Sequence, residues 1–288
     1  WEVRTALILF RFIASTSASI ASLVIALPNS ASCLGVSAEK LRISEETGRK
    51  AVELVNKNIK CLDIINEKSV ENAIRVLMAT GGSTNLIIHL IAIARRANID
   101  LTLDDFERIS KETPVLVNVK PHGTENVGMG FHNAGGVASL MKEMEHMLNG
   151  ECLTVSGKTV SENLKEIDMP YDKNTIRPLD NPIVEKGGIA VLYGNLAPNG
   201  AVIKRSAAST RLLKHRGPAK VFENLTECQK YLLDENSDIT PDTVIVLRGY
   251  GPKGAPGMPE NGNFMPLPPK LNKMGINDFV RITDARMS

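Results

Sequence analysis

A carboxylate at the end of a glycine- and proline-rich segment is the first candidate for chemistry in this chain of 288 residues. The segment Gly251–Glu260 reads GPKGAPGMPE, a composition that can form neither a helix nor a central strand. Glu260 therefore stands on an irregular loop. A hard oxygen ligand of this kind suits Mg²⁺, which usually takes one or two carboxylates and leaves its other positions to water or substrate. From composition alone, a solvated surface turn is the simpler interpretation.

A second candidate is the motif GGSTN at residues 81–85, which separates two apolar segments. Backbone N–H groups at the start of the following helix could bind an anion there, beside Ser83, Thr84 and Asn85. Ser83 could equally be only the N-cap of that helix.

A third candidate is SGKT at residues 156–159, which has the ending of a phosphate-binding loop. The full motif requires a second glycine five residues before its last one, and Cys152 stands at that position. We therefore exclude nucleotide hydrolysis. Lys158 and Thr159 remain candidates for contact with an anionic substrate, although a turn capped by Thr159 or Ser161 explains the motif as well.

The histidines and cysteines form no metal-binding pattern. His89 lies in an apolar segment and is best explained as a core histidine, and the ten-residue separation of His122 and His132 matches no ligand spacing. No two cysteines form a C-x-x-C pair, so each is interpreted as a small buried apolar residue in a reducing intracellular compartment. The cysteines are Cys33, Cys61, Cys152 and Cys228.

Composition favours a folded enzyme-like protein over a nucleic-acid-binding one. Apolar residues make up 43% of the chain, which is enough for a sizeable core and, at this length, for two domains. The net charge is only +2 and aromatic residues are 4%, so neither a basic stripe nor a base-stacking surface is expected. Residues 5–27 are apolar enough to raise a signal peptide or membrane span, but Arg11 and several Ser and Thr residues favour a buried helix and no membrane partner.

The periodicity of residues 44–148 predicts a helix-rich α/β domain. We expect a helix over 44–59 with Val52, Leu54 and Val55 on its apolar side, and a second helix capped by Ser69. Thr102 and Asp105 form the ends of a capping box that opens another helix. The remaining expected elements are a buried helix at 86–97, a strand leading into a turn at 113–123 and a glycine-led helix at 134–148.

The pattern changes near residues 170–182, where proline, aspartate and asparagine suggest a linker. Short apolar runs bounded by glycine follow, which predict a β-barrel-like, β-rich second domain with one helix at 225–235. The runs lie at 189–194, 201–206, 219–224, 243–251 and 278–285.

Nine segments, in this order, resemble the dihydroxy-acid and sugar-acid dehydratase family, and the resemblance covers residues 20–288. The segments are ATGGSTN (79–85), LTLDDFERIS (101–110), TVSGKTVSENL (154–164), IRPLDNPI (176–183), GGIAVLYGNLAPNGAVIK (187–204), HRGPAKVFEN (215–224), GPKGAPGMPE (251–260), MPLPPKL (265–271) and VRITDARMS (280–288). Several motifs in one order are far more specific than any single motif.

This resemblance implies an α/β domain at residues 1–172 followed by a β-barrel domain at 173–288, both incomplete. It implies a hydro-lyase that converts a 2,3-dihydroxy acid to a 2-keto-3-deoxy acid with an iron–sulfur cluster, [2Fe–2S] in many members, and Mg²⁺. Glu260 matches the family's Mg²⁺-binding glutamate. Ser288 matches the serine that, as an alkoxide, takes the proton from C2. The family match also strengthens substrate contact at Ser83, Thr84, Asn85, Lys158 and Thr159.

The substrate is expected to be a small sugar acid, because MPLPPKL and DARMS look more like the arabinonate and xylonate dehydratases. The alternative is the dihydroxy-acid dehydratase of branched-chain amino-acid synthesis. A homodimer or homotetramer in the cytoplasm, or in mitochondria of a eukaryote, is the expected setting.

The chain departs from the family where the cluster is bound. Two of the three cluster cysteines belong upstream, the third should precede Ala14, and residues 5–13 contain no cysteine. The other Mg²⁺ ligands, an acidic residue and a modified lysine, also belong upstream. Since the chain begins with Trp1 and stops at Ser288 within a motif, we expect a fragment. The rival hypothesis is an inactive family remnant that holds no cluster.

Overall fold

The computed structural model describes residues 38–120, 123–124, 129–167, 172–251, 253–255, 261 and 264–287. The chain divides into two compact units, Trp1–Ala207 and Ala208–Ser288, which are described separately. The helix expected within 5–27 lies outside the described residues. Over the part that is described, no helix has the length and apolar character needed to cross a membrane.

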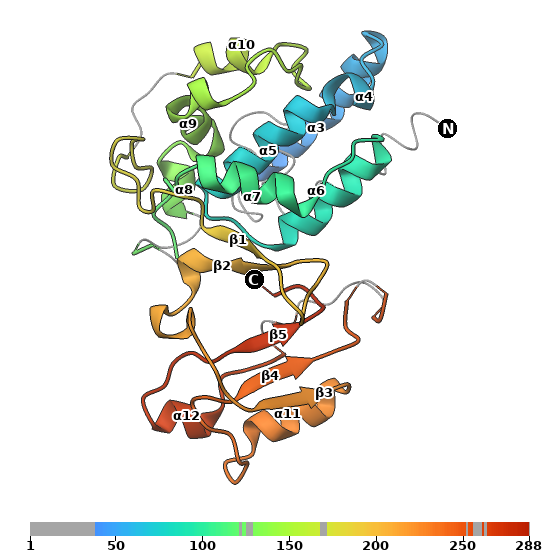
Figure 1. Ribbon diagram of the computed structural model, residues 1–288. Coiled ribbons are helices and arrows are strands. Elements are labelled where there is room, and N and C mark those ends of the chain that lie inside the picture. Colours follow the sequence, from blue (N-terminus) through green and yellow to red (C-terminus); the bar gives the residue numbers. More distant parts are fainter. Residues whose placement is uncertain are drawn as a thin grey trace. The chain divides into compact units, whose positions relative to one another are not determined.

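The first unit is a helical assembly with one β-hairpin, drawn from blue to yellow in Figure 1. Its α-helices are α3 (Ala38–Asn56), α4 (Cys61–Ile64), α5 (Glu67–Ala79), α6 (Asn85–Arg96), α7 (Leu103–Glu112), α8 (Met129–Asn133), α9 (Gly136–Glu143) and α10 (Val160–Lys165). Short 3-10 helices cover Glu145–Met147 and Arg205–Ala207. Strands β1 (Ile189–Leu192) and β2 (Ala201–Lys204) pair antiparallel.

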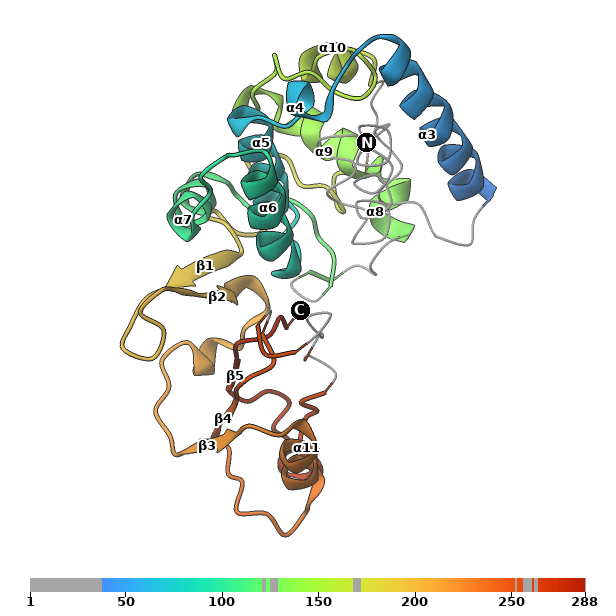
Figure 2. The same ribbon diagram turned by 90° about the vertical axis from the view of Figure 1, so that its right-hand side faces the viewer.

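Helix α5 is the centre of this unit. Nearly its whole second half is buried, and it packs against α6, α7 and α9 (Figure 2). Ile74, Leu77 and Met78 of α5 and Phe106 of α7 are at most 1% exposed. Burying side chains of this size stabilises the fold by roughly 1.5–3 kcal/mol each. This packing positions the loop that leaves α5 and carries GGSTN.

Two expectations about the first helices need correction. Helix α3 exists but begins at Ala38, and the side chains of Val52 and Val55 are 62% and 57% exposed, whereas Leu54 packs against the core. Ser69 is not the N-cap of α5, because Asn66 holds that position. Ser69 is the third helical residue, and its hydroxyl accepts the Asn66 N–H at 2.9 Å while Asn66 Oδ1 accepts the Ser69 N–H at 3.0 Å.

The strand expected at 113–123 forms only isolated bridges, at Val115 with Val184 and at Val117 with Ile176. Val115 and Val117 are almost completely buried, so the apolar residues of this segment do belong to the core, as a buried strand would require. Leu116, which lies between them, donates to the Ala79 carbonyl at 2.8 Å. The backbone N–H and C=O groups of this segment therefore form hydrogen bonds with several different segments, and they do not form a continuous β-ladder with one strand.

The second unit contains a small three-stranded parallel sheet with a helix between successive strands. Its elements are a 3-10 helix (Thr210–Leu212), β3 (Ala219–Phe222), α11 (Leu225–Leu233), β4 (Val244–Leu247), α12 (Pro269–Lys273) and β5 (Arg281–Thr283). The sheet order is β3-β4-β5 with both pairs parallel, as Figure 1 shows. Each parallel pair is joined through a helix, as parallel connections require. Its core includes Cys228, Leu232, Ile245 and Leu247.

The mixed α/β class and the strand-rich second part are confirmed, and each predicted run beyond 188 contains one of the strands β1–β5. The described strands form two open sheets, and none of them closes a barrel. Apolar runs bounded by glycine do not distinguish parallel from antiparallel pairing, which explains the difference. The domain boundary at 172/173 stays a prediction, and the hairpin β1–β2 belongs to the first compact unit.

Candidate active site

The loops that follow β4 and β5 form the framework around the predicted chemistry in the second unit. Because these strands are parallel, their carboxyl ends lie at one edge of the sheet, where α/β proteins usually bind ligands. The Asp284 carboxylate follows β5 and accepts the N–H groups of Gly249 and Tyr250 at 3.1 and 3.0 Å. One carboxylate therefore joins the start of the glycine- and proline-rich loop to the DARMS segment.

Close backbone contacts explain two glycines of this loop. A Cβ at Gly251 would lie 2.6 Å from the Asp284 carbonyl oxygen, and a Cβ at Gly254 would lie 2.2 Å from that of Gly249. Neither contact leaves room for a side chain. The N–H of Gly254 also donates to the Gly251 carbonyl at 3.0 Å, which folds the loop back on itself.

Asn261 is the buried connection between the two functional segments. Its side chain is completely buried, and its backbone N–H donates to the Arg286 carbonyl at 2.9 Å. Its Nδ2 reaches the Thr283 hydroxyl at 3.4 Å, whereas its Oδ1 is buried and has no hydrogen-bond partner among the described residues. A buried amide with one weak contact is held by its surroundings rather than by its own hydrogen bonds.

Glu260 and Ser288 themselves lie outside the described residues, so their roles as metal ligand and base stay predictions. Their described neighbours are close together. Glu260 directly precedes Asn261, and Ser288 follows Arg286 by two positions, so the hydrogen bond between Asn261 and Arg286 joins the two segments that carry them.

The GGSTN motif in the first unit is a tightly packed turn between α5 and α6. A Cβ at Gly82 would lie 2.7 Å from Leu77 Cδ1. The Ser83 hydroxyl accepts the Asn85 N–H at 3.2 Å, and Thr84, which is 8% exposed, is the N-cap of α6. All three polar residues of the motif have partners. The motif thus organises the helix start, and substrate contact by Ser83, Thr84 and Asn85 stays a prediction.

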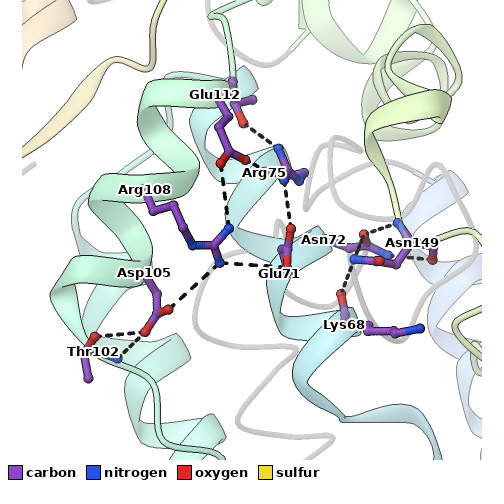
Figure 3. A network of polar contacts seen from close by, with 10 residues as sticks. Lys68, Glu71, Asn72, Arg75, Thr102, Asp105, Arg108, Glu112 and Asn149 are labelled. Atoms are coloured by element: carbon purple, nitrogen blue, oxygen red, sulfur yellow. Dashed lines mark hydrogen bonds and ion pairs between the residues drawn. The ribbon is translucent and has the colours of Figure 1, made fainter.

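A polar network holds the helix that leads into this turn (Figure 3). The Arg75 guanidinium of α5 pairs with Glu71 and Glu112, each at 2.8 Å, and its side chain is only 12% exposed. Arg108 of α7 reaches Glu71, Asp105 and Glu112 at 3.9 Å each, with half of its side chain exposed. Arg75 therefore makes the closest ion pairs between α5 and α7. Arg108 adds longer and more exposed pairs to the same two glutamates.

The predicted capping box at Thr102 is confirmed. Of the two caps considered for the turn at 156–159, the structure has Thr159, which also forms a capping box with Glu162. Thr159 is the N-cap of α10: its hydroxyl accepts the Glu162 N–H at 3.2 Å, and its own N–H donates to Glu162 at 2.7 Å. Lys158 pairs with Glu166, and this hydrogen bond raises the pKa of Lys158. Both side chains have local structural partners, so a substrate role for them stays a prediction.

The described residues do not fit an iron–sulfur cluster. No group of three His, Cys, Asp or Glu side chains in the described ranges could hold a metal ion. Cys61 is exposed on α4, while Cys152 and Cys228 lie in the cores of different units. Burial raises the pKa of Cys228 to about 11, which favours the thiol over the thiolate that binds metal. We therefore derive no step through a cluster.

The histidines have ordinary structural surroundings. His89 is buried in α6, as predicted, and has a partner. His132 Nε2 lies 3.0 Å from Glu39 Oε2. His122 lies outside the described residues.

Sequence reasoning missed Asn261 and Asp284. Both stand inside or beside recognised motifs, but their contribution is a hydrogen bond to another segment, which spacing along the chain does not reveal.

Comparison with known proteins assigns both parts of the chain to one family. Residues 9–163 match the domain described as dihydroxy-acid/6-phosphogluconate dehydratase N-terminal, and residues 174–288 match its C-terminal counterpart. The L-arabonate dehydratase of Azospirillum brasilense is 44% identical over 270 residues, which are 93% of this chain and 46% of that protein.

Two other relatives carry different names. The 6-deoxy-6-sulfo-D-gluconate dehydratase of Pseudomonas putida is 43% identical over 96% of this chain and 48% of its own length. A dihydroxy-acid dehydratase of Prochlorococcus marinus is 43% identical over 96% of this chain and 50% of its own length. The chain spans about half the length of the curated relatives it matches. It belongs to the dihydroxy-acid/6-phosphogluconate dehydratase family.

Proposed function

We propose that this chain is part of a hydro-lyase that removes water from a 2,3-dihydroxy sugar acid to give a 2-keto-3-deoxy acid. Family membership over both matched regions and relatives named as dehydratases support it. The observation that carries the proposal is the hydrogen bond between Asn261 and Arg286, because it joins the loop that ends in Glu260 to the segment that ends in Ser288.

In the proposed reaction, the Ser288 alkoxide takes the proton from C2 while the C3–O bond breaks, and the departing hydroxide then takes that proton from the serine, so that water leaves and the alkoxide is restored. The resulting enol tautomerises to the ketone. Glu260 would hold Mg²⁺, which when bound supplies Lewis acidity that favours the alkoxide form of a serine and acidifies the C2–H bond. We propose that the iron–sulfur cluster of the family would be bound by a longer protein that includes this chain, and we assign none of its ligands to the residues described here.

A sugar acid is the preferred substrate over a branched-chain dihydroxy acid. The segments MPLPPKL and DARMS support this choice, and both kinds of relative match at similar identity. We also propose a homo-oligomer in a reducing compartment such as the cytoplasm, in line with the free thiols of the three described cysteines.

A chimaera with a relative tests the function. Residues 20–288 of this chain would replace the matching segment of the A. brasilense L-arabonate dehydratase, whose upstream part is retained. Formation of keto acid would be measured by NMR with L-arabinonate, D-xylonate and 2,3-dihydroxyisovalerate. We expect turnover of the two sugar acids, and no turnover by the isolated chain, since loss of cofactor assistance should slow the reaction by many orders of magnitude.

The rival hypothesis, an inactive remnant, predicts a different outcome. A chimaera that folds, judged by circular dichroism, and shows the visible absorption of a bound cluster but forms no keto acid would refute the proposed function. Turnover by the isolated chain would refute the expectation that it is inactive alone.

A further inference from the structure

Helix α3 carries apolar side chains on two opposite faces. Ile43 and Leu54 are partly buried, and Leu54 packs against the core of the first unit. Leu41 and Val52 stand two positions before them, which is about 200° around the helix, and are 72% and 62% exposed. The helix therefore has an inner apolar face beside the core and an outer apolar face that the described residues leave largely uncovered.

The outer face is a continuous stripe along most of the helix, which we call the α3 stripe. Its residues are seven, four and three positions apart, a spacing that places them on one side: Leu41, Gly48, Val52 and Val55. Val55 is 57% exposed. Arg49 and Glu45 beside the stripe pair with each other at 2.6 Å, so they add no net charge to it.

The described packing of α3 is sparse for a helix of 19 residues. None of these residues is buried, whereas helices in proteins owe most of their stability to the packing of an apolar face. Glu39 Oε2 lies 3.0 Å from His132 Nε2 of α8, which ties the first turn to the unit. Figure 2 shows α3 standing apart from α5, α6 and α7. A helix that is apolar on two faces is expected to lie between two layers, and the described residues supply one of them.

The segment that precedes α3 has the composition of the second layer. Residues 5–27 carry one charged side chain, Arg11, among mostly apolar and small residues. Residues 9–163 match one family domain, so most of this segment belongs to the same domain as α3. The segment lies outside the described residues, and its sequence favours a buried helix over a membrane span. A buried helix requires an apolar surface, and the α3 stripe is one.

The lengths of the segment and the stripe agree. With its 19 residues α3 is about 28 Å long, and residues 5–27 would form a helix of roughly 34 Å. The ten residues that join them, 28–37, can span about 33 Å when extended. The segment can therefore reach the whole stripe in either direction.

We propose that residues 5–27 dock on the α3 stripe of the same chain. The short connection favours this occupant over a second copy of the chain, because it keeps the segment at a high effective concentration. The stripe exposes three large apolar side chains, Leu41, Val52 and Val55, whose area is well below the roughly 800 Å² per partner that a stable interface between separate chains buries. The docking does not depend on the proposed reaction.

Photochemical cross-linking of the full chain identifies the occupant. Val52→p-benzoylphenylalanine places a reactive ketone on the stripe, and mass spectrometry maps the cross-linked peptides. An equal mixture of unlabelled and ¹⁵N-labelled chains distinguishes products within a chain from products between chains. We expect cross-links from position 52 to residues 5–27 of the same chain. Leu196 is 68% exposed in the same unit, so the same probe there is the matched control and should not cross-link to residues 5–27.

A substitution tests the docking by the sign of its effect on stability. Glutamate is a better helix former than valine, so V52E on an uncovered face should leave the melting temperature unchanged or raise it. Beneath a docked segment the new carboxylate is desolvated, and V52E should lower the melting temperature by roughly 5 °C or more. It should also speed amide hydrogen exchange in residues 5–27 by about tenfold or more, whereas L196E should do neither.

The wild-type chain gives an answer without any variant, because docking predicts slow amide exchange in residues 5–27. Exchange there as fast as in an unfolded peptide would overturn the proposal, as would a V52E chain that melts no lower than the wild type. Cross-links between differently labelled chains would overturn it in favour of a second copy as the occupant. Cross-links from position 52 only to other segments, equal yields from positions 52 and 196, or no cross-link at all would also contradict it.

Discussion

The backbone N–H of Asn261 donates to the carbonyl of Arg286 at 2.9 Å, although 25 positions separate the two residues. The residue directly before Asn261 is Glu260, which ends the glycine- and proline-rich loop. Asp284 strengthens the same junction through Gly249 and Tyr250. The fold of the second unit thus joins the loop that carries the proposed metal ligand to the segment that carries the proposed base.

Asn261→Asp should destabilise the second unit in a pH-dependent way. Asn261 is completely buried, so an ionised carboxylate there should cost roughly 3 kcal/mol or more, whereas the protonated acid fits. Burial raises the pKa of such a carboxyl, so stability should fall as pH rises above the ordinary aspartate range. Urea unfolding at several pH values measures this. Asn236, which is exposed, provides the control N236D, and equal behaviour of the two variants would contradict the burial argument.

Ser288→Ala and Glu260→Gln should separate two roles in the chimaera. Removing the serine deletes the base and leaves the metal site, so substrate should still bind while turnover collapses. Removing the carboxylate takes one of the few protein ligands from Mg²⁺, so both metal retention and substrate affinity should fall. Calorimetry with the acid substrate and metal analysis of each variant provide the measurements. Wild-type turnover in S288A, or unchanged Mg²⁺ binding in E260Q, would contradict the corresponding role.

Arg75→Met should loosen the junction between α5 and α7. Arg75 is 12% exposed and pairs with two carboxylates at 2.8 Å, so its loss leaves Glu71 and Glu112 without their closest partner. We expect a loss of about 2 kcal/mol of unfolding free energy. Arg108→Met is the matched control, since Arg108 is 50% exposed and its pairs are 3.9 Å long, and it should change stability by less than about 0.5 kcal/mol. Equal losses in both variants would show that proximity to α7, rather than the buried pairs, matters.

Glu107→Gln should flatten the acid dependence of stability. Burial favours the neutral acid, but the Val191 N–H and Lys111 outweigh it and lower the pKa of Glu107 below its ordinary value of 4.5. A lowered pKa contributes stability above pH 4.5 that is lost as pH falls through the value in the folded protein. The difference in melting temperature between wild type and E107Q should therefore be largest near neutral pH and shrink in acid. A constant difference across this range would contradict the linkage.

Local chemistry allowed much of the fold to be predicted. Thr102 and Asp105, which lie three positions apart, correctly predicted the start of α7, and Thr159, one of the two caps considered for the turn at 156–159, is the N-cap of α10. The first helix shows the limit. Val52 and Val55 have the right spacing for an apolar face, yet they are exposed in the structure, because spacing indicates a face and not what covers it.

The candidate site could be predicted only where a motif carried it. GGSTN and the glycine- and proline-rich loop were recognised from their residues, but the junction at Asn261 depends on a segment 25 positions away. That junction is a product of tertiary structure rather than of local propensity.

The most direct test of the account is the conversion of L-arabinonate deuterated at C2 by the chimaera, followed by NMR. Removal of the C2 proton by Ser288 predicts that a 2-keto-3-deoxy acid forms, that its formation is slower than from the protiated acid, and that S288A abolishes it. A folded chimaera with bound cluster that forms no keto acid, or an S288A chimaera that forms it at the wild-type rate, would contradict the account.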